Sequence, residues 1–347
     1  MNTGTKQPTI NDVAAMAGVS KRTVSRVINA SDKVNQATRA RVLEVIDQLD
    51  FTPNRQARGL AARRSYLIGL VYDIPTLFIS DVQRGVLNVC EDTGYELVVH
   101  ACHTDSKEAI TNIVKFVTRA RVDGLIICSP VSEIDGLEPA LKKAGCAYIR
   151  FTSTLGSGPR KRVVTDYLPA ISDMTRHLVE FGHRDFGFIS GPRGNISARK
   201  RHESFVRALA EYDLELPKNM IVEGAFTFDS GVAASRKLLS RNPQPTAIFA
   251  ANDEMAFGVM NVAAEKGIKI PEELSVVGFD GTPFATFVVP SLSTIIRKTD
   301  EMSRLATLKL LALINEGTDA LLKFETLVSP QFIPRQSTGP VPAKKGS

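Results

Sequence analysis

Residues 9–42, TINDVAAMAGVSKRTVSRVINASDKVNQATRARV, contain the start and stop signals of three short helices. Thr9 precedes an acid by three residues, as in the capping box that begins a helix. Gly18 suits the left-handed conformation that ends a helix, and Ser20 and Asn35 are of the residue types that cap the next two. Three short helices, the first two joined by a tight turn that contains glycine, predict a helix-turn-helix domain.

The second predicted helix carries polar and basic side chains on the side away from its apolar stripe. Its first turn, with Lys21 and Arg22, is the part of such a domain that enters a DNA major groove, where Arg and Lys bind guanine edges. An ordinary three-helix bundle with a polar outer face has the same spacing. Positive charge at a helix N-terminus opposes the helix dipole, however, which favours the DNA-binding interpretation. The residues predicted to contact DNA here are Thr9, Ser20, Lys21, Arg22, Thr23, Ser25, Arg26 and Asn29.

The excess positive charge of the chain lies entirely in its first fifth. Residues 1–64 hold 11 Lys and Arg against 5 Asp and Glu, a net charge of +6, whereas residues 65–347 hold 32 of each sign. A solvated basic tail would show the same imbalance. Together with the helix-turn-helix pattern, the asymmetry indicates a polyanionic partner, which we take to be double-stranded DNA.

The length and composition of the chain are those of a globular protein with more than one domain. A chain of 347 residues is too long for one core, because single cores stop growing near ~250–300 residues. The hydrophobic fraction is 43%, yet no apolar run reaches the ~18–20 residues of a membrane span. The first residues, MNTGTKQPT, lack the apolar core of a secretory signal. We therefore expect a cytoplasmic protein that makes no contact with the membrane.

No combination of residues predicts a metal site, another cofactor or a catalytic set. The four cysteines form no CxxC pair and are expected to be small buried side chains. His100, Cys102 and His103 end a predicted strand, where alternate side chains point to opposite faces, so they do not form a metal site. No nucleophile motif accompanies His183. The sequence thus argues against an enzyme.

Beyond residue 65, short apolar runs alternate with stretches of helical periodicity. This βαβα order predicts parallel sheets with helices on both faces, and the length allows two doubly wound lobes. The predicted fold class is therefore an all-α head followed by an α/β sensor of two such lobes. The predicted strands are Leu67–Tyr72, Glu96–His100, Gly124–Cys128, Ala147–Ile149, Phe186–Ile189, Ala247–Ala250 and Ser275–Gly278.

The two predicted lobes face one another across a cleft. In doubly wound sheets, ligands bind beyond the carboxyl ends of the strands. Polar residues stand at several of these ends, namely Asp73, Arg150, Asn252 and Asp280. Carboxylates and an amide that converge on a cleft suit a hydroxyl-rich ligand, although polar residues are also common at strand ends that bind nothing.

Residues 9–42 resemble the DNA-binding head of the LacI/GalR family of bacterial transcription regulators, nearly position for position. DFTPNRQARGLAARRSYLIGLV, residues 50–71, is similar to that family's hinge and first sensor strand, and QFIPRQSTG, residues 331–339, extends the resemblance almost to the C-terminus. The resemblance implies a sensor that is like the periplasmic binding proteins. The expected segments are a head (1–50), a hinge (51–65), a sensor (66–340) and a disordered tail (341–347), with the first lobe at about 66–165 and 298–326 and the second at about 166–297 and 327–340.

The hinge holds a short helix-capable stretch that carries several arginines. About two helical turns are too short to be stable alone in water. The resemblance implies that this helix forms when two subunits meet over the DNA minor groove, with Leu60 inserted into the central base step. Packing of Leu60 against the sensor is the alternative. The hinge residues expected to contact DNA are Asn54, Arg55, Arg58 and Leu60.

The resemblance also assigns residues to a ligand site. ISGPRGNISAR implies that Arg199 is the arginine that holds the ligand, AANDEMAFG implies Asn252 as an amide, and VVGFDGT implies Asp280 as an acid. EGAFTFDSG aligns an aromatic that stacks on the ligand, and IPTLFISDV supplies the first lobe's contribution. The expected effector-binding residues are Asp73, Phe78, Arg150, Arg199, Phe226, Asn252 and Asp280.

The charge of the ligand is left open by these residues. Arg150 lies near a place where some sugar-binding members of the family carry an acid, and with Arg199 it could hold a carboxylate or a phosphate. A neutral sugar fits Asp280 and Asn252 equally well. We therefore expect a sugar or sugar-derived metabolite, in either a neutral or an acidic form.

The predicted function is that of a transcriptional repressor. A homodimer would bind a pseudo-palindromic operator and would be released by a ligand between the lobes. A corepressor-type ligand would reverse the sign of this effect. A solute-binding protein would share the sensor fold, but the basic head argues against it. The C-terminal PVPAKKGS contains no leucine heptads, which favours a dimer over a tetramer.

Overall fold

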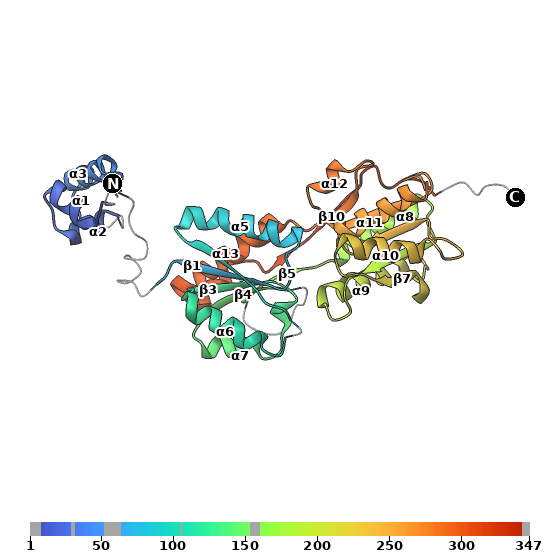
Figure 1. Ribbon diagram of the computed structural model, residues 1–347, viewed down its shortest axis with the longest axis horizontal. Helices are drawn as coiled ribbons and strands as arrows, with labels where there is room; N and C mark the ends of the chain where they lie inside the picture. Colours follow the sequence, from blue (N-terminus) through green and yellow to red (C-terminus); the bar gives the residue numbers. More distant parts are fainter. Residues whose placement is uncertain (1–7, 29–31, 52–63, 105, 153–159, 342–347) are drawn as a thin grey trace, which may run out of the picture. The chain divides into compact units, whose positions relative to one another are not determined.

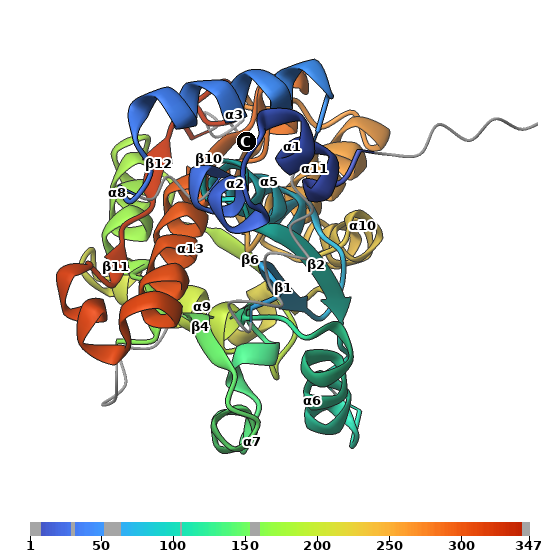
Figure 2. The ribbon, with the colours of Figure 1, turned by 90° about the vertical axis from the view of Figure 1, so that its left-hand side faces the viewer.

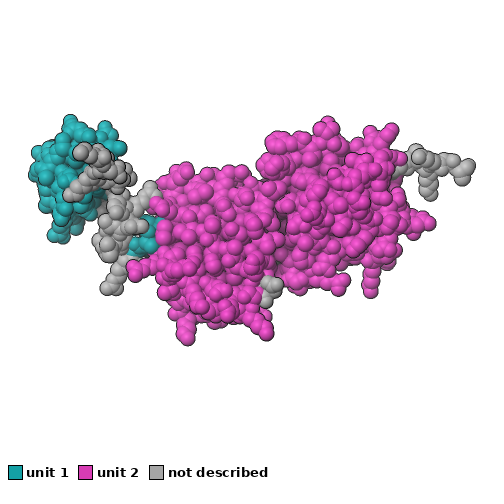
Figure 3. Space-filling view, viewed as in Figure 1, with its two compact units in different colours: residues 1–66 teal, residues 67–347 magenta. Residues whose placement is uncertain are grey.

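The chain separates into two compact units, residues 1–66 and residues 67–347 (Figure 3). Each unit has its own hydrophobic core. The structure is a computed structural model, and the residues that it describes are 8–28, 32–51, 64–104, 106–152 and 160–341.

The first described helix, α1 (Ile10–Ala17), begins and ends as its sequence predicts. The Thr9 backbone amide and hydroxyl both donate to the Asp12 carboxylate, at 2.7 and 2.6 Å. Gly18 follows the helix with a φ of 65°, a left-handed conformation that glycine adopts without the steric cost of a side chain. The tight turn to the next helix is built on this residue.

The next two helices, α2 (Lys21–Ile28) and α3 (Gln36–Gln48), complete the described core of the first unit. The Thr23 amide donates to the Ser20 hydroxyl oxygen at 3.1 Å, and the Thr38 amide donates to the Asn35 side chain at 2.8 Å, so each cap uses a backbone donor that a helix start leaves unpaired. The helices pack through a small apolar core. Its buried members are Val13, Ala14, Ala17, Val24, Val27, Val42, Val45 and Phe51.

The first lobe of the second unit is built on a parallel sheet in the order β11-β5-β4-β3-β1-β2. Figure 1 and Figure 2 show α5 and α13 side by side on one face and α6 and α7 on the other. Because both faces are covered, the central strands are continuous apolar runs. The elements are β1 (Leu67–Tyr72), α5 (Leu77–Thr93), β2 (Glu96–Ala101), α6 (Ala109–Ala120), β3 (Gly124–Ile127), a short 3-10 turn (Val131–Glu133), α7 (Leu137–Lys143), β4 (Ala147–Thr152), β5 (Arg162–Thr165), α13 (Thr299–Glu316), a second 3-10 turn (Thr318–Lys323) and β11 (Leu327–Val328).

The second lobe repeats this plan with the order β12-β10-β9-β8-β6-β7, in which only the edge strand β12 runs antiparallel. α8 packs against α9, and α10 packs against α11. The elements are α8 (Leu168–Glu180), β6 (Phe186–Ser190), α9 (Ile196–Ala210), a 3-10 turn (Lys218–Met220), β7 (Ile221–Glu223), α10 (Phe228–Leu238), β8 (Ala247–Ala250), α11 (Asp253–Glu265), β9 (Ser275–Asp280), α12 (Phe284–Phe287), β10 (Ser293–Ile296) and β12 (Gln331–Ile333).

The chain passes between the lobes three times, after β5, after β10 and after β11. The expected lobe boundary near residue 326 differs slightly from this arrangement, because β11 pairs with β5 and keeps residues 327–328 in the first sheet. Arg297 and Lys298 form the second crossing, and Lys298 has a φ of 53°. These crossings place the carboxyl ends of both sheets opposite one another.

The returning helix α13 is fixed to the first lobe by a buried lysine. The Lys309 ammonium donates to the Arg162 carbonyl at 2.7 Å, to the Glu325 carbonyl at 3.2 Å and to the Thr326 hydroxyl oxygen at 3.3 Å. Burial lowers the pKa of this amine to about 8. Lys309 thus joins α13 to β5 and to the segment before β11, and it holds the helix that follows the second crossing.

The predicted fold class is confirmed, since the helix-turn-helix head is followed by two parallel-sheet lobes. Among the described residues, no helix is both long and apolar enough to span a membrane. The Cys90, Cys102, Cys128 and Cys146 thiols are all buried and unpaired by disulfides.

Candidate functional site

A cavity of about 270 Å³ lies between the two lobes at the carboxyl ends of their strands. The first lobe lines it with residues at or just after the ends of β1, β3 and β4, among them Asp73, Ser129 and Thr152. The second lobe lines it from the start of α9 and from the ends of β8 and β9. The cavity is therefore at the place where a doubly wound fold binds ligands.

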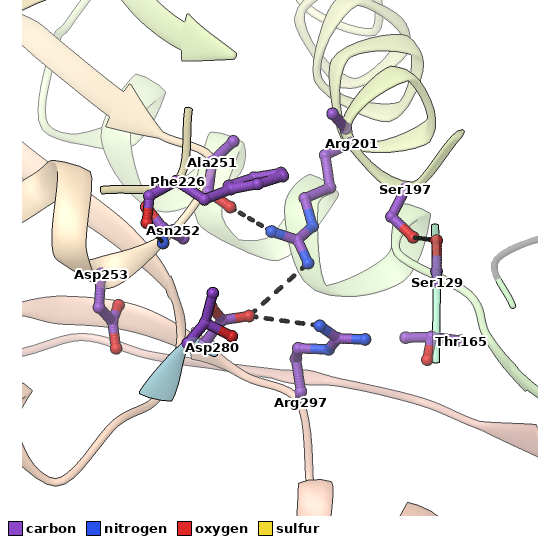
Figure 4. Close-up of polar contacts among 12 residues, drawn as sticks. Ser129, Thr165, Ser197, Arg201, Phe226, Ala251, Asn252, Asp253, Asp280 and Arg297 are labelled. Carbon is purple, nitrogen blue, oxygen red and sulfur yellow. Dashed lines mark hydrogen bonds and ion pairs between the residues drawn. The ribbon is translucent and has the colours of Figure 1, made fainter. Parts of the chain in front are cut away.

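A buried carboxylate between two arginines occupies the second-lobe side of the cavity (Figure 4). The Asp280 Oδ1 atom lies 3.6 Å from Nη2 of Arg201 and 3.5 Å from Nη1 of Arg297. Asp280 ends β9 with a φ of 114°, a conformation that a non-glycine residue adopts only when its surroundings enforce it. Burial raises the pKa of Asp280, and the two guanidinium groups oppose this rise.

Aromatic rings hold the guanidinium of Arg201 in place. Its central carbon lies 3.8 Å from the centroid of the Phe279 ring and 5.2 Å from that of Tyr167. The Nη1 atom donates to the Ala251 carbonyl. A cation over aromatic faces is attracted by their electrons, and burial lowers the pKa of Arg201. Arg201 is thus fixed at the cavity wall with one edge turned towards Asp280 (Figure 4).

Asn252 and Phe226 form a second, neighbouring part of the wall. The Asn252 amide nitrogen donates to the Phe226 carbonyl at 2.9 Å, and its oxygen caps α11 by accepting from the Met255 amide at 3.0 Å. Phe226 has a φ of 61°, and a Cβ at Gly191 would lie only 2.1 Å from its ring. The aromatic side chain therefore fits against this part of the cavity because residue 191 has no side chain.

Behind Asp280, the buried Asp253 joins the elements that present the site. Its Oδ2 atom accepts from the Thr282 amide at 2.7 Å and from the Thr282 hydroxyl at 3.0 Å, and its Oδ1 atom accepts from the Thr294 hydroxyl at 2.5 Å. Burial, with a further contribution from Asp280, raises the pKa of Asp253 to about 7. These bonds connect the start of α11 to the loop after β9 and to β10.

The first lobe contributes an aromatic, a carboxylate and contacts across the cleft. The Phe78 ring lies 3.8 Å from the guanidinium carbon of Arg297, and Asp73 accepts from the Thr104 hydroxyl at 3.2 Å. The Ser197 hydroxyl of the second lobe donates to Ser129 of the first at 3.4 Å. The two lobes therefore meet through specific polar and aromatic contacts at the cavity.

Of the residues that the sequence assigned to the effector site, the structure brings five together at the cavity. These five are Asp73, Phe78, Phe226, Asn252 and Asp280.

Arg199 and Arg150 are not at the cavity. The Arg199 side chain is 55% exposed and lies 3.6 Å from Glu203, because Ser197, Ala198 and Arg201 form the buried stripe of α9. The arginine that α9 places at the cavity is thus Arg201, two residues further along. Arg150 pairs with Glu138 at 2.7 Å inside the first lobe.

The sequence reasoning also missed Arg201, Arg297, Ser129, Ser197 and Thr152, which line the cavity. The helical periodicity of α9 could have identified Arg201, because it lies four residues after Ser197 on the same face. Thr152 lies on the same face of β4 as Arg150 but at the end of the strand, which is nearer to the cleft. Arg297 follows a strand that the apolar pattern did not reveal.

In the first unit, the basic first turn of α2 is exposed, whereas Val24 and Val27 are buried. Lys21 and Arg22 are exposed and Ser25 and Arg26 are partly exposed, so the polar face of the helix is accessible. Thr9 caps α1, and Ser20 and Thr23 form the start of α2. Asn29, Asn54, Arg55, Arg58 and Leu60 lie outside the described residues.

Both units match known families. Residues 9–54 match the family described as bacterial regulatory proteins, lacI family, and residues 175–338 match the periplasmic binding protein-like domain. Within the described residues, no three His, Cys, Asp or Glu side chains are grouped so that they could hold a metal ion.

Known proteins match this chain over most of its length. Catabolite control protein A of Priestia megaterium is 33% identical over 312 residues, which cover 89% of this chain and 93% of that protein. The chain belongs to the LacI family. A second LacI-family relative, the HTH-type transcriptional repressor PurR of Haemophilus influenzae, is 32% identical over 334 residues, with 95% of this chain and 98% of that protein covered.

Solved structures of transcription regulators are similar over almost the whole chain. The lac repressor dimer bound to operator and the anti-inducer ONPF has a TM-score of 0.80 at 28% identity and covers 96% of this chain and 100% of that one. The transcriptional regulator CelR in complex with cellobiose has a TM-score of 0.69 at 29% identity and covers 95% of this chain and 99% of that one. The protein is accordingly a DNA-binding transcription regulator with a small-molecule sensor, and the family predicted from sequence is confirmed.

Proposed function

We propose that this LacI-family regulator is a homodimeric repressor, that it binds a pseudo-palindromic operator, and that a small sugar-like effector releases it from DNA. The observation that supports this proposal most strongly is the cavity between the lobes, whose wall combines carboxylate, amide and hydroxyl groups with aromatic faces. Such a wall suits a ligand with several hydroxyl groups. A repressor works where the bacterial DNA is, so the protein would act in the cytoplasm and would not need to catalyse a reaction.

In this proposal, the exposed face of α2 reads the operator. Lys21 and Arg22 would contact base edges in the major groove, while the remaining polar residues of the head would contact bases or phosphates. The hinge residues Asn54, Arg55 and Arg58 would contact the DNA backbone, and Leu60 would enter the minor groove. These four roles rest on the sequence resemblance alone, since the four residues lie outside the described part of the chain.

An exposed apolar patch on the second lobe supports a dimer. Phe284 and Phe287 of α12 and the following Val289 form this α12 patch, and Phe287 and Val289 are 72% and 93% exposed. Leu87 of α5 and Val99 of β2 are exposed on the first lobe. Large apolar side chains that gather at a surface are typical of protein interfaces. We assign these residues to the contact between two subunits.

Experiment distinguishes two effects of the effector on DNA binding, namely release of the repressor and tighter binding. Cellobiose is bound by CelR and the anti-inducer ONPF by the lac repressor, which supports a sugar-like ligand for this chain as well. We propose that the ligand favours the lobe geometry in which the two hinges separate, so that it acts as an inducer. The alternative is a corepressor, which would favour the geometry that binds DNA.

The proposal is tested by selecting binding sites for the full-length protein from a random DNA library and by measuring its mass in solution. We expect enriched sites with two inverted half-sites about one DNA turn apart, and a dimer that Phe287→Ser weakens. Leu322→Ser is the matched control, because Leu322 is also exposed but lies in the 3-10 turn after α13, away from the α12 patch. A single asymmetric half-site, or a monomeric wild-type protein, would contradict the proposal.

A further inference from the structure

The charges at the second-lobe side of the cavity are unbalanced. Arg201 and Arg297 are 3% and 8% exposed, and both guanidinium groups face the same carboxylate, Asp280. Within the described part of the chain, no other carboxylate lies within 4.0 Å of either guanidinium. Two buried positive charges therefore share one negative charge, an arrangement that costs free energy unless a further anion or strong acceptors approach.

The hydrogen-bonding groups of this cluster are also incompletely used. Among the described residues, the Nε atoms of Arg201 and Arg297 and the Oδ1 atom of Asp280 are buried and have no hydrogen-bond partner. The distances from Asp280 Oδ1 to the two guanidinium groups, 3.6 and 3.5 Å, are longer than a hydrogen bond. Each guanidinium thus makes only long contacts to Asp280 and keeps one N–H donor unsatisfied (Figure 4).

The two guanidinium planes are fixed before any ligand binds. Arg297 stacks on Phe78 of the first lobe and Arg201 stacks on Phe279 of the second, with 3.8 Å from guanidinium carbon to ring centroid in both cases. Stacking occupies the faces and leaves the edges, where the N–H donors lie, for hydrogen bonding. A planar carboxylate matches such edges because it accepts two parallel N–H bonds.

The positive charge of the two arginines changes the pKa of the neighbouring Tyr167. Burial by itself raises the pKa of Tyr167, but the fields of Arg297 and Arg201, with hydrogen bonds from Ser197 and Arg201, bring it below its ordinary value. The other cavity carboxylate, Asp73, accepts from Thr104 and lies 3.4 Å from His103 on the first lobe. Asp280 is therefore the cavity carboxylate that faces the arginine pair, and the buried Asp253 lies behind it with a pKa raised to about 7.

We propose that the effector is a small polyhydroxylated acid, such as a sugar acid, whose carboxylate is bound by Arg201 and Arg297. The carboxylate of the ligand balances the arginine charge that Asp280 leaves uncompensated. The hydroxyl groups of the ligand contact the polar wall of the cavity, which includes Ser129, Thr152 and Asn252. The cavity of about 270 Å³ is slightly smaller than the ~300–1,000 Å³ of most small-molecule sites, which suits a ligand of about one sugar unit. This inference rests on the proposed function, in which the cavity holds the effector.

Arg297 is the residue that decides between an acidic and a neutral ligand. Without it, Arg201 and Asp280 would form a balanced pair with no net charge, which fits a neutral sugar. Arg150, the arginine that the sequence suggested for this role, is paired with Glu138 and with the Ser132 carbonyl. It provides a matched control, since it is a partly buried, ion-paired arginine of the same unit that does not line the cavity.

The test is a thermal-shift and calorimetric titration of the full-length protein with matched acids and neutral sugars. The probes are D-gluconate, D-glucuronate and D-galacturonate against D-glucose and D-galactose, with D-glucose 6-phosphate as a different anion. We expect at least one of the three carboxylates to bind and its neutral parent to bind at least tenfold more weakly. Arg297→Gln should weaken the carboxylate by about tenfold to a hundredfold, as expected for a lost charged hydrogen bond. Arg150→Gln should leave the affinity unchanged.

Arg297→Lys keeps the positive charge but removes the pair of parallel N–H donors of the guanidinium. This variant should therefore retain part of the affinity for the carboxylate. Binding of a neutral sugar in preference to its acid, binding of the phosphate alone, or no binding of any of the three carboxylates would overturn the proposal. So would equal losses in the Gln variants at positions 297 and 150. Operator binding by the same preparations is measured in parallel, so that a failure of this inference is distinguished from a failure of the repressor proposal.

Discussion

His183 shows how a single buried side chain can hold distant segments together. Its Nδ1 atom is 2.9 Å from the Thr246 hydroxyl, and its Nε2 atom is 3.0 Å from both the Ser275 hydroxyl and the Gly339 carbonyl. The three partners come from the segment before β8, from β9 and from the chain after β12. Burial lowers the pKa of His183 below its ordinary value of 6.5. The folded second lobe therefore keeps this imidazole neutral.

This lowered pKa predicts that the contribution of His183 to stability falls in acid. Below pH 6.5 the unfolded chain binds a proton at this histidine that the folded chain resists, so the free energy of unfolding falls as the pH drops towards the folded-state pKa. His100, His177 and His202 are shifted in the same direction by burial and add to the effect. These histidines therefore lower the melting temperature between pH 7 and pH 5, whereas the raised pKa values of Asp253 and Asp280 act in the opposite direction.

His183→Gln isolates the contribution of this residue. At pH 7 the variant should be less stable by about 1–3 kcal/mol, because buried partners lose a hydrogen bond. Its melting temperature should then fall less than that of the wild type between pH 7 and pH 5, since glutamine does not titrate. Calorimetry of both proteins over this range is the measurement. Parallel curves for the two proteins would mean that His183 does not contribute to the acid sensitivity.

At the scale of elements, α2 gives the most direct prediction about DNA binding. Arg22 lies in the exposed first turn of this helix, which the proposal places in the major groove. Arg22→Ala should weaken binding to the selected operator by about 1–3 kcal/mol, or roughly tenfold to a hundredfold, and should relax the preference at one base position. Fluorescence anisotropy with the operator and with unrelated DNA provides both numbers.

Arg41→Ala is the control for this prediction, because it removes the same charge from the exposed side of α3 in the same unit. A loss of a phosphate contact weakens binding to all DNA sequences alike and lowers its salt dependence. We therefore expect the Arg41 variant to have similar effects, small in size, on operator and unrelated DNA. If Arg22→Ala also affected both DNAs equally, the role of α2 in base recognition would be refuted.

The elements that the sequence could predict are those whose residues carry a local signal. β1 and β8 lie at the predicted bounds, because a central strand covered on both faces is a continuous apolar run. β10 and β11 were missed because Ser293–Ile296 is half hydroxyl-bearing and Leu327–Val328 is only two residues long. Such strands are defined by pairing with distant neighbours, which no short window of sequence contains.

The candidate site was likewise predictable only where its residues carry a local signal in the sequence. Asn252 and Asp280 were predicted because they end recognisable strands, and the displaced Arg199 would have been corrected by the helical periodicity of α9. Arg297 carries no such local signal. It reaches the cavity because the chain crosses between the lobes directly after β10, and its partner Phe78 comes from the other lobe. The charge of the site therefore depends on the tertiary arrangement.

At the scale of the whole molecule, the second unit can respond to a ligand because its two lobes are joined by few polar contacts at the cavity. The Glu254 carboxylate of α11 accepts from the Leu77 amide of α5 at 3.5 Å, and Ser197 meets Ser129 at 3.4 Å. Burial raises the pKa of Glu254, while the bond from Leu77 lowers it. A ligand held by residues of both lobes adds contacts in parallel with these, so it stabilises one lobe geometry over others.

Linkage gives this mechanism a quantitative prediction. If the effector lowers operator affinity by a certain factor, then operator DNA must lower effector affinity by the same factor, because the two binding free energies share one coupling term. We expect a factor of about 5–150, the usual range for such coupling, with the weaker effector binding in the operator complex. Calorimetric titration of the effector into the free protein and into the operator complex measures one side, and operator titration with and without effector measures the other. Equal factors of the opposite sign would identify a corepressor, whereas an operator affinity that the effector leaves unchanged would refute the coupling between the two sites.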